Sequence, residues 1–244
     1  MKLKSEGNNY SVNRLIKFSG LAINASFPAE AFDFAYDMAF GEGYHRDHRS
    51  GGLLSRSRVE IFRNTFQGKL AEIILYNELK KNNIEIETPD FNVYGKGLWD
   101  DADLIANGKY ICVKSAAFFS NLLLLEAKDW DKEGRYIPNM GLKDTVHTYD
   151  YFVLVRIKPD VKSLFGDDVK DRNKFQDKLD TIEWWYDIPG CCSIKTIRHI
   201  IEKNYILPQH SILNNKTRMD AENFYIQSGD LKPLKNLYEA LKQK

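Results

Sequence analysis

Apolar residues repeat at helical spacing along residues 58–82, the strongest such pattern in the chain. Neighbouring members of this stripe are three or four positions apart, so they share one face of an α-helix: Val59, Phe62, Phe66, Leu70 and Ile73. We therefore expect a long helix that packs this face against the core. The same spacing over fewer turns predicts three shorter helices, at residues 27–41, 193–204 and 232–242.

The remaining apolar segments are short and have the composition of strands. Residues 149–157, YDYFVLVRI, are apolar on both faces, which is typical of a central strand. Residues 84–88 alternate between apolar and polar positions, and residues 224–226 predict a last strand. Residues 122–125 fit either a buried strand or part of a helix, and the highly charged residues 158–180 predict an exposed helix or excursion.

Residues 99–115, WDDADLIANGKYICVKS, predict a β-hairpin whose turn is Asn107-Gly108, a pair that adopts the positive φ angles of a type I′ turn. A two-residue turn pairs Asp103 with Cys112 and Asp101 with Lys114. Directly opposed residues share a face of the sheet, as do residues two apart on a strand. Carboxylates beside one lysine suit a divalent cation and a phosphate. The alternative is a solvated hairpin face that happens to be charged.

Glu72 lies off the buried stripe of the long helix, on a half-apolar flank. Gly68 precedes it by one turn on the same side. Because glycine inside a helix costs about 1 kcal/mol relative to alanine, its presence suggests a close approach by another backbone or by a ligand. Glu72 is therefore a candidate for the same site as the hairpin, although a lone glutamate on a helix is normally a surface residue.

The composition is that of a soluble globular protein, with 244 residues of which 43% are apolar. No apolar run approaches the ~20 residues of a membrane span, and the polar N-terminus lacks a signal-peptide pattern, so we expect a cytoplasmic protein without membrane contact. Three cysteines cannot form a disulfide framework. The net charge is only +1, but residues 45–69 are basic and could contact phosphates, or could be a solvated loop; their candidate contacts are Arg46, Arg49, Arg56, Arg58 and Lys69.

A helix with Glu72, a strand with Asp103 and a strand ending in Lys114 together resemble the PD-(D/E)XK nuclease superfamily, over roughly residues 58–115. The resemblance implies an α/β fold: a restriction-endonuclease-like three-layer core with a mixed central β-sheet flanked by helices. We expect one domain in three parts: residues 1–57 as a helical and basic-loop region, 58–180 as the nuclease core, and 181–244 as a C-terminal extension.

The resemblance also implies a metal-dependent DNA endonuclease, of the type II restriction class, that cuts double-stranded DNA as a homodimer. Asp103 would then be the central ligand of Mg²⁺, or of Mn²⁺ as its substitute, and Glu72 an auxiliary ligand. Lys114 would orient or activate the attacking water and contact the scissile phosphate. Asp101, on the same face, is a candidate substitute ligand.

One position departs from the superfamily pattern, which places Asp or Glu two residues before the lysine where this chain has Cys112. Cysteine is a soft ligand and a poor one for Mg²⁺. Three explanations remain open. Asp101 or Glu126 supplies the acid, or the cysteine was introduced to suppress cleavage, or the chain is a catalytically silent DNA-binding protein on the same fold. A nuclease for repair or junction processing is a further alternative.

Overall fold

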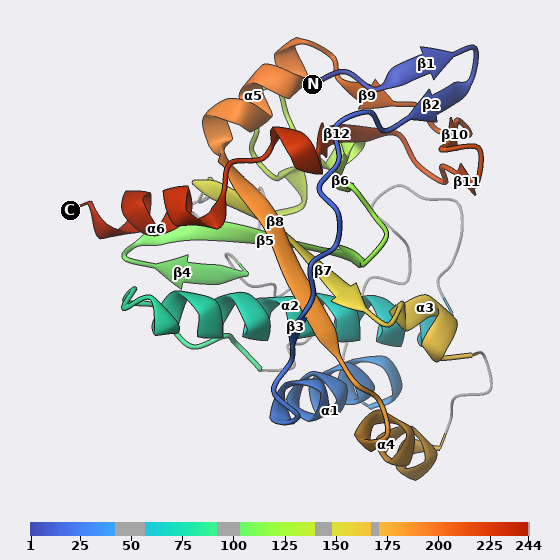
Figure 1. The fold of residues 1–244 in the computed structure, drawn as a ribbon, viewed down its shortest axis with the longest axis vertical. Helices are drawn as coiled ribbons and strands as arrows, with labels where there is room; N and C mark the ends of the chain where they lie inside the picture. The colour runs from blue at the N-terminus through green and yellow to red at the C-terminus, as the bar shows by residue number, and fades with distance from the viewer. Residues whose placement is uncertain (42–56, 92–102, 140–147, 167–170, 244) are drawn as a thin grey trace.

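The computed structural model describes residues 1–41, 57–91, 103–139, 148–166 and 171–243, and its central element is a mixed five-stranded sheet (Figure 1). The strand order is β3-β8-β7-β5-β4, in which β5 and β7 are parallel and the other neighbours are antiparallel. The bounds are Leu21–Ala22 for β3, Leu104–Ala106 for β4, Lys109–Ala117 for β5, Tyr151–Lys158 for β7 and Trp185–Ser193 for β8.

The predicted hairpin is present as β4 and β5. Asn107 and Gly108 form its turn with φ angles of +46° and +69°, as a type I′ turn requires. Leu104 is paired with Ile111 and Ala106 with Lys109, which is the register that the two-residue turn predicts. The hairpin therefore carries alternate residues of β5 to opposite faces of the sheet.

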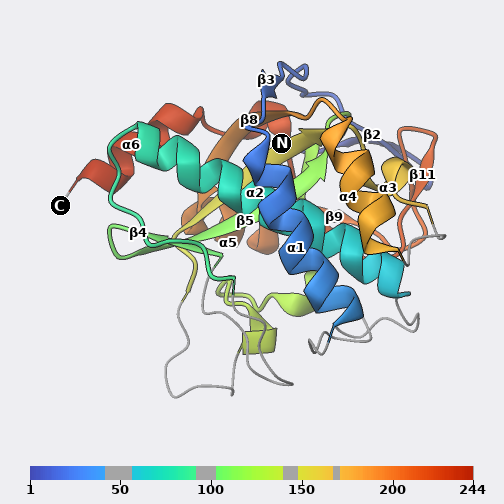
Figure 2. The same cartoon turned by 90° about the horizontal axis from the view of Figure 1, so that it is seen from below.

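The sheet is covered on both faces, so the chain forms three layers. One face is covered by α2 (Arg58–Lys81), against which the apolar side of β5 and β7 packs, and α1 (Ser26–Phe40) packs in turn on α2 (Figure 2). The opposite face packs against α5 (Ile194–Glu202) and a second, smaller sheet. The expected α/β fold with a mixed central sheet is confirmed.

The central strand is β7, as its two apolar faces predict. It lies between β5 and β8, and its residues from Phe152 to Ile157 are buried. The long predicted helix is α2, which begins at a capping box in which Ser57 and Glu60 each satisfy the other's backbone N–H. The helix ends at Asn82, next to the positive φ of Asn83.

Elsewhere in the described ranges there are two small sheets and three further helices. Residues 122–126 are a strand rather than a helix, because they pair along their full length with β12. The charged residues 158–180 contain two short helices. The smaller sheets have the orders β6-β12-β9 and β1-β2-β10-β11. The bounds are β1 Lys4–Glu6, β2 Asn9–Ser11, β6 Leu122–Glu126, α3 Val161–Leu164, α4 Arg172–Asp180, β9 Ile206–Leu207, β10 Ile212–Leu213, β11 Thr217–Arg218, β12 Asn223–Gln227 and α6 Leu234–Lys242, with 3₁₀ turns at Ala127–Asp129, Ile137–Asn139 and Ser228–Asp230.

A buried ion pair fastens the N-terminal segment to the central sheet. Arg156 of β7 is fully buried and donates two hydrogen bonds to the carboxylate of Asp187 on β8, at 2.7 and 2.5 Å. Its remaining terminal nitrogen donates to the carbonyls of Ile16 and Ser120. Asp187 also accepts from the backbone N–H of Ser19. Residues 16–19 are thus held against the sheet by one polar cluster.

In the described part of the chain, no helix combines the length and the apolar character that crossing a bilayer requires.

Candidate functional site

The hairpin brings three of the predicted site residues together. The backbone N–H of Val113 donates to Asp103 Oδ2 at 2.6 Å, which holds the Asp103 carboxylate against β5. The Cys112 thiol lies within hydrogen-bonding reach of the Asp103 and Lys114 side chains. Asp103, Cys112 and Lys114 therefore form one group at the face of the sheet that packs against the second small sheet, and we call it the hairpin cluster.

Lys114 is a protonated cation in this cluster. Burial works to lower the pKa of its ammonium, but the neighbouring Cys112 and Asp103 side chains outweigh burial, so the pKa lies above its ordinary value. The ammonium lies 5.9 Å from the centre of the Trp130 ring, within the range of a cation–π contact. A lysine in this state can attract a phosphate, but it is a poor base near neutral pH.

Cys112 is a neutral thiol. Its side chain is only 1% exposed, and burial raises its pKa well above the ordinary range despite the opposing effect of Lys114. The thiolate is the form that acts as a nucleophile or binds a metal. Cys112 is therefore suited to neither role in this structure.

Three aromatic residues that local sequence patterns did not point to lie close to the hairpin cluster. Two of them, Trp130 and Tyr136, contact one another with ring centres 5.1 Å apart. Tyr149 is 8% exposed, and burial raises its pKa well above the ordinary value, with further contributions from Asp103 and Cys112. Its phenol is thus a neutral hydrogen-bond donor beside the cluster. The one sequence signal was the aromatic content of these segments.

Glu72 lies on α2 and is held by Lys69, three residues before it. The Lys69 ammonium donates to Glu72 Oε2 at 2.5 Å and to the carbonyl of Asp90 at 2.8 Å. It also lies 4.6 Å from the ring centre of Phe34 and 5.3 Å from that of Phe91. The charge of Glu72 is one contribution to the raised pKa of Tyr149, but α2 lies on the opposite face of the central sheet from the hairpin cluster.

This placement corrects one expectation from the sequence. Lys69 was a candidate contact for DNA phosphates, but its side chain is only 6% exposed and its ammonium is bonded inside the protein. Gly68 was expected to allow a close approach by another backbone or by a ligand. Among the described residues outside its own stretch of helix, no heavy atom lies within 4 Å of the position that a Cβ of Gly68 would occupy, so no backbone approaches there and the expectation of a ligand stays a prediction.

Replacing Lys69 by Met is expected to lower the free energy of unfolding by about 1.5–3 kcal/mol, the usual value of hydrogen bonds to charged groups. The change removes the hydrogen bonds that the Lys69 ammonium donates to Glu72 and to the carbonyl of Asp90. Lys81→Met is the matched control, because Lys81 forms an ion pair of the same spacing with Glu78 on the same helix, with 66% of its side chain exposed. Urea unfolding of both variants measures the difference, and equal losses would contradict a special role for Lys69.

Of the remaining predicted site residues, two belong to other elements and four fall outside the described residues. Glu126 is at the end of β6 and forms an ion pair with Lys128 at 2.7 Å. Arg58 is the exposed first residue of α2, where it remains a candidate DNA contact. The candidates outside the described residues are Asp101, Arg46, Arg49 and Arg56.

The described residues do not fit the Mg²⁺ ion that the resemblance implies. Mg²⁺ requires hard oxygen ligands in octahedral geometry. One Asp103 oxygen already accepts from the backbone, Cys112 is a neutral thiol, and Glu72 is paired with Lys69. Within the described ranges, no group of three or more His, Cys, Asp or Glu side chains is arranged to hold a metal ion. We therefore derive no catalytic step through a metal.

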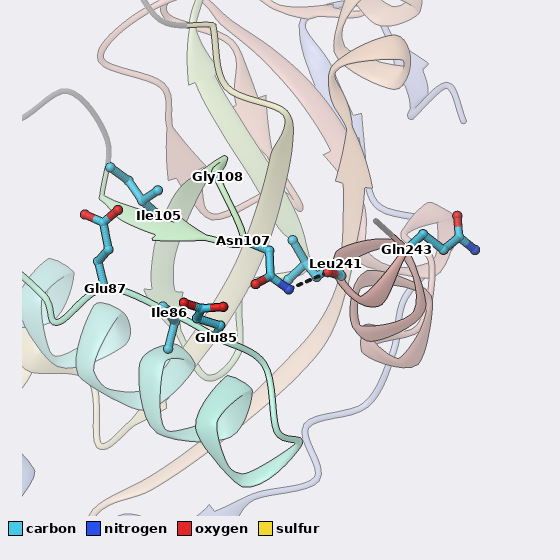
Figure 3. Close-up of a pocket in the computed structure, with 8 residues that line it drawn as sticks. All are labelled: Glu85, Ile86, Glu87, Ile105, Asn107, Gly108, Leu241 and Gln243. Carbon is cyan, nitrogen blue, oxygen red and sulfur yellow. Dashed lines mark hydrogen bonds between the residues drawn. The ribbon is translucent and has the colours of Figure 1, made fainter.

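A separate hollow of about 430 Å³ lies beside the hairpin turn (Figure 3). It is bounded by the turn, by residues 85–87 and by the end of α6, where Asn107 donates to the carbonyl of Leu241 at 2.6 Å. Glu85 and Glu87 line it, and among the described residues no basic side chain does. Their negative charges disfavour a phosphate in this hollow.

The thiols are expected to resist modification until the chain unfolds. Burial raises the pKa of Cys191 to about 11 from 9.0, and it raises those of Cys112 and Cys192 further. A raised pKa means that the folded chain keeps these protons at a pH where the unfolded chain releases them, so stability is lost as the pH rises above about 9. Titration with a chromogenic thiol reagent at pH 8, with and without urea, tests this; a thiol that reacts rapidly in the folded chain would contradict it.

Comparisons with models of protein families, with curated proteins and with solved structures found no match to this chain. The hairpin cluster and its surroundings are therefore interpreted from their own geometry and chemistry.

Proposed function

We propose that this chain is a nucleic-acid-acting protein of the restriction-endonuclease-like class. The support is the order of its elements: α2 carries Glu72, the hairpin that follows carries Asp103, and β5, which lies beside the central strand of a mixed sheet, carries Lys114. This is the layout on which the resemblance to PD-(D/E)XK nucleases is based. The fold alone does not define an activity, so the proposal depends on the hairpin cluster.

Within that class, we propose an endonuclease that hydrolyses phosphodiester bonds of double-stranded DNA, of the type II restriction kind and acting as a homodimer. The observation that carries this proposal is that the Asp103 carboxylate, fixed by Val113, lies close enough to Lys114 to help keep its ammonium protonated. A fixed cation stabilises the negative charge that develops on phosphate oxygens during hydrolysis. Asp103 is fixed by Val113, and it is the group that can orient an attacking water.

The raised pKa of Lys114 refines its role. An ammonium that stays protonated does not remove a proton from water near neutral pH, so Lys114 binds the scissile phosphate and neutralises charge. Tyr149, a neutral phenol close to the cluster, is a second donor that can reach a phosphate oxygen or the leaving oxygen. These two groups bind and orient, and neither forms a covalent intermediate.

The neutral thiol of Cys112 favours a second candidate, a catalytically silent DNA-binding protein on the same fold. The buried thiol adds no negative charge where the superfamily has an acid. Such a protein would bind duplex DNA through its basic surface and leave it intact.

Incubation of a long mixed-sequence duplex with the full chain, in Mg²⁺ and separately in Mn²⁺, distinguishes these functions. Discrete fragments indicate a restriction-type enzyme, and preferential cutting of branched substrates indicates a junction nuclease. Binding without cleavage in either ion contradicts the endonuclease proposal and supports the silent protein.

A further inference from the structure

The small sheet β1-β2-β10-β11 projects from one end of the molecule, away from the central sheet (Figure 1), and we call it the wing. It joins residues 4–11 to residues 212–218, and each strand is only two or three residues long. One face packs on the body through Tyr10 and Leu213, which contact the apolar cluster around Leu207 and Tyr225. The opposite face is turned outward.

The outward face of the wing carries one row of mostly polar side chains, with one residue from each of its four strands. Glu6 is paired with Asn9, Asn9 with Ile212 and Ile212 with Arg218, so their side chains lie side by side. All four residues are exposed, and Ile212 is 37% exposed. Burial of apolar surface does not explain this row, since it faces away from the core.

The wing is also more basic than the chain as a whole. Residues 4–11 and 212–218 contain three basic residues and one acidic residue, whereas the whole chain has a net charge of +1. Lys4, Lys216 and Arg218 are all exposed. A local positive charge on an exposed element attracts the DNA backbone without making the protein basic overall.

Two asparagines brace the wing from within. Asn8 Nδ2 donates to the carbonyl of His210 at 3.1 Å, and Asn214 Oδ1 accepts from the N–H of Val12 at 3.0 Å. Asn214 and Asn215 form the β10–β11 turn, with φ angles of +51° and +56°. Asn8 and Asn214 are therefore used in hydrogen bonds within the wing, whereas Asn9 and Arg218 present an amide and a guanidinium on the outward row.

We infer that the outward row of the wing reads base edges in the major groove of double-stranded DNA, with Asn9 and Arg218 as its specificity-determining residues. This inference rests on the proposed function. The major groove admits a narrow β-ribbon. There, arginine forms paired hydrogen bonds with guanine, asparagine forms them with adenine, and an apolar side chain such as Ile212 can contact the thymine methyl group. Lys4 and Lys216 contact the flanking phosphates.

Selection of bound sequences from a randomised duplex pool tests the inference without requiring cleavage. The full chain is used in EDTA, together with Asn9→Ala, Arg218→Ala and Arg218→Lys. We expect the wild type to enrich one sequence, and each variant to lose about 5- to 150-fold preference at a defined base pair, the value of one paired contact. Arg218→Lys keeps the charge but loses the planar fork, so its nonspecific affinity should stay close to that of the wild type.

Lys235→Ala is the matched control, because Lys235 lies on α6, away from the wing, with 80% of its side chain exposed. This variant should select the wild-type sequence. Unchanged selection by the Asn9 and Arg218 variants would overturn the inference, as would binding by the wild type without sequence preference. Altered dimerisation of the wing variants without altered selection would make the wing a protein contact and would also overturn it.

The outcomes separate this inference from the proposed function. A wild-type chain that selects a sequence through the wing but never cleaves DNA would refute the endonuclease and leave the wing as the reading element. Cleavage at a sequence that the wing variants do not change would refute the wing alone. Failure of the wild type to bind duplex DNA would refute both.

Discussion

Replacing Cys112 by Asp is expected to raise the rate of divalent-cation-dependent cleavage of duplex DNA by about 10- to 100-fold. This is the usual loss of activity when a group that orients a metal ligand is removed. The side chain at position 112 lies beside Asp103 and Lys114. A carboxylate there would add a second hard oxygen donor to the hairpin, which the neutral thiol does not supply. Its charge would be offset by the Lys114 ammonium, although the position is only 1% exposed. Initial cleavage rates at a series of Mg²⁺ concentrations measure the change.

The matched control for this prediction is Cys112→Asn, which has the shape of aspartate without its charge. We expect Cys112→Asn to cleave no faster than the wild type. If both variants gained activity equally, the change in shape rather than the carboxylate would be responsible. If Cys112→Asp remained folded and bound DNA but cleaved it no faster than the wild type, the missing acid would not belong at position 112.

Replacing Arg156 by Met is expected to lower the free energy of unfolding by about 3–5 kcal/mol, because it leaves a buried carboxylate without its partner. Arg156 is fully buried and Asp187 is 8% exposed. The same change removes the hydrogen bonds that hold the carbonyls of Ile16 and Ser120. Urea unfolding followed by circular dichroism measures the loss, and a change below about 1 kcal/mol would contradict a structural role for this ion pair.

The double variant Arg156→Met with Asp187→Leu separates the effect of the unpaired Asp187 charge from the effect of losing the hydrogen bonds to the backbone. Replacing both members of a buried ion pair by apolar residues costs much less than removing one. We therefore expect the double variant to be more stable than Arg156→Met alone, but less stable than the wild type, because the Ile16 carbonyl and the N–H of Ser19 still lose their partners. Strictly additive losses would contradict coupling between the two residues.

Local patterns were sufficient to predict the elements that form the site. The Asn107-Gly108 turn determines the hairpin register, because few other dipeptides adopt two positive φ angles, and the register in turn places Asp103 beside Cys112. The apolar stripe of α2 and the two apolar faces of β7 were equally informative, because each periodicity matches one type of secondary structure.

Contacts between distant segments could not be predicted in the same way. A lysine at this position of the sequence predicts an exposed side chain. In the structure, however, Phe34 and Phe91 cover the Lys69 ammonium, and Glu72 forms an ion pair with it. Trp130 reaches Lys114 only because the chain after β6 folds back over β5. Such approaches depend on tertiary packing, which the periodicity of a single segment does not contain.

The N-terminal residues show the same limit of local patterns most clearly. Residues 1–26 carry no strong periodicity, yet they form half of the wing and the segment held by Arg156. Each strand of the wing is too short to produce an alternating pattern, and its partners lie about 200 residues away in the sequence. An arginine within a strand of apolar residues was the one local sign of the buried cluster.

Cleavage of duplex DNA by the wild-type chain and by Lys114→Ala tests the endonuclease proposal most directly. Lys109→Ala is the control, since Lys109 is on the same strand but has the opposite parity to Lys114, and half of its side chain is exposed. We expect discrete fragments from the wild type and from Lys109→Ala. Lys114→Ala should cleave about 10²–10³-fold more slowly, the usual cost of removing one group that stabilises transition-state charge. Equal cleavage by Lys114→Ala, with DNA binding unchanged, would show that the hairpin cluster is not the active site.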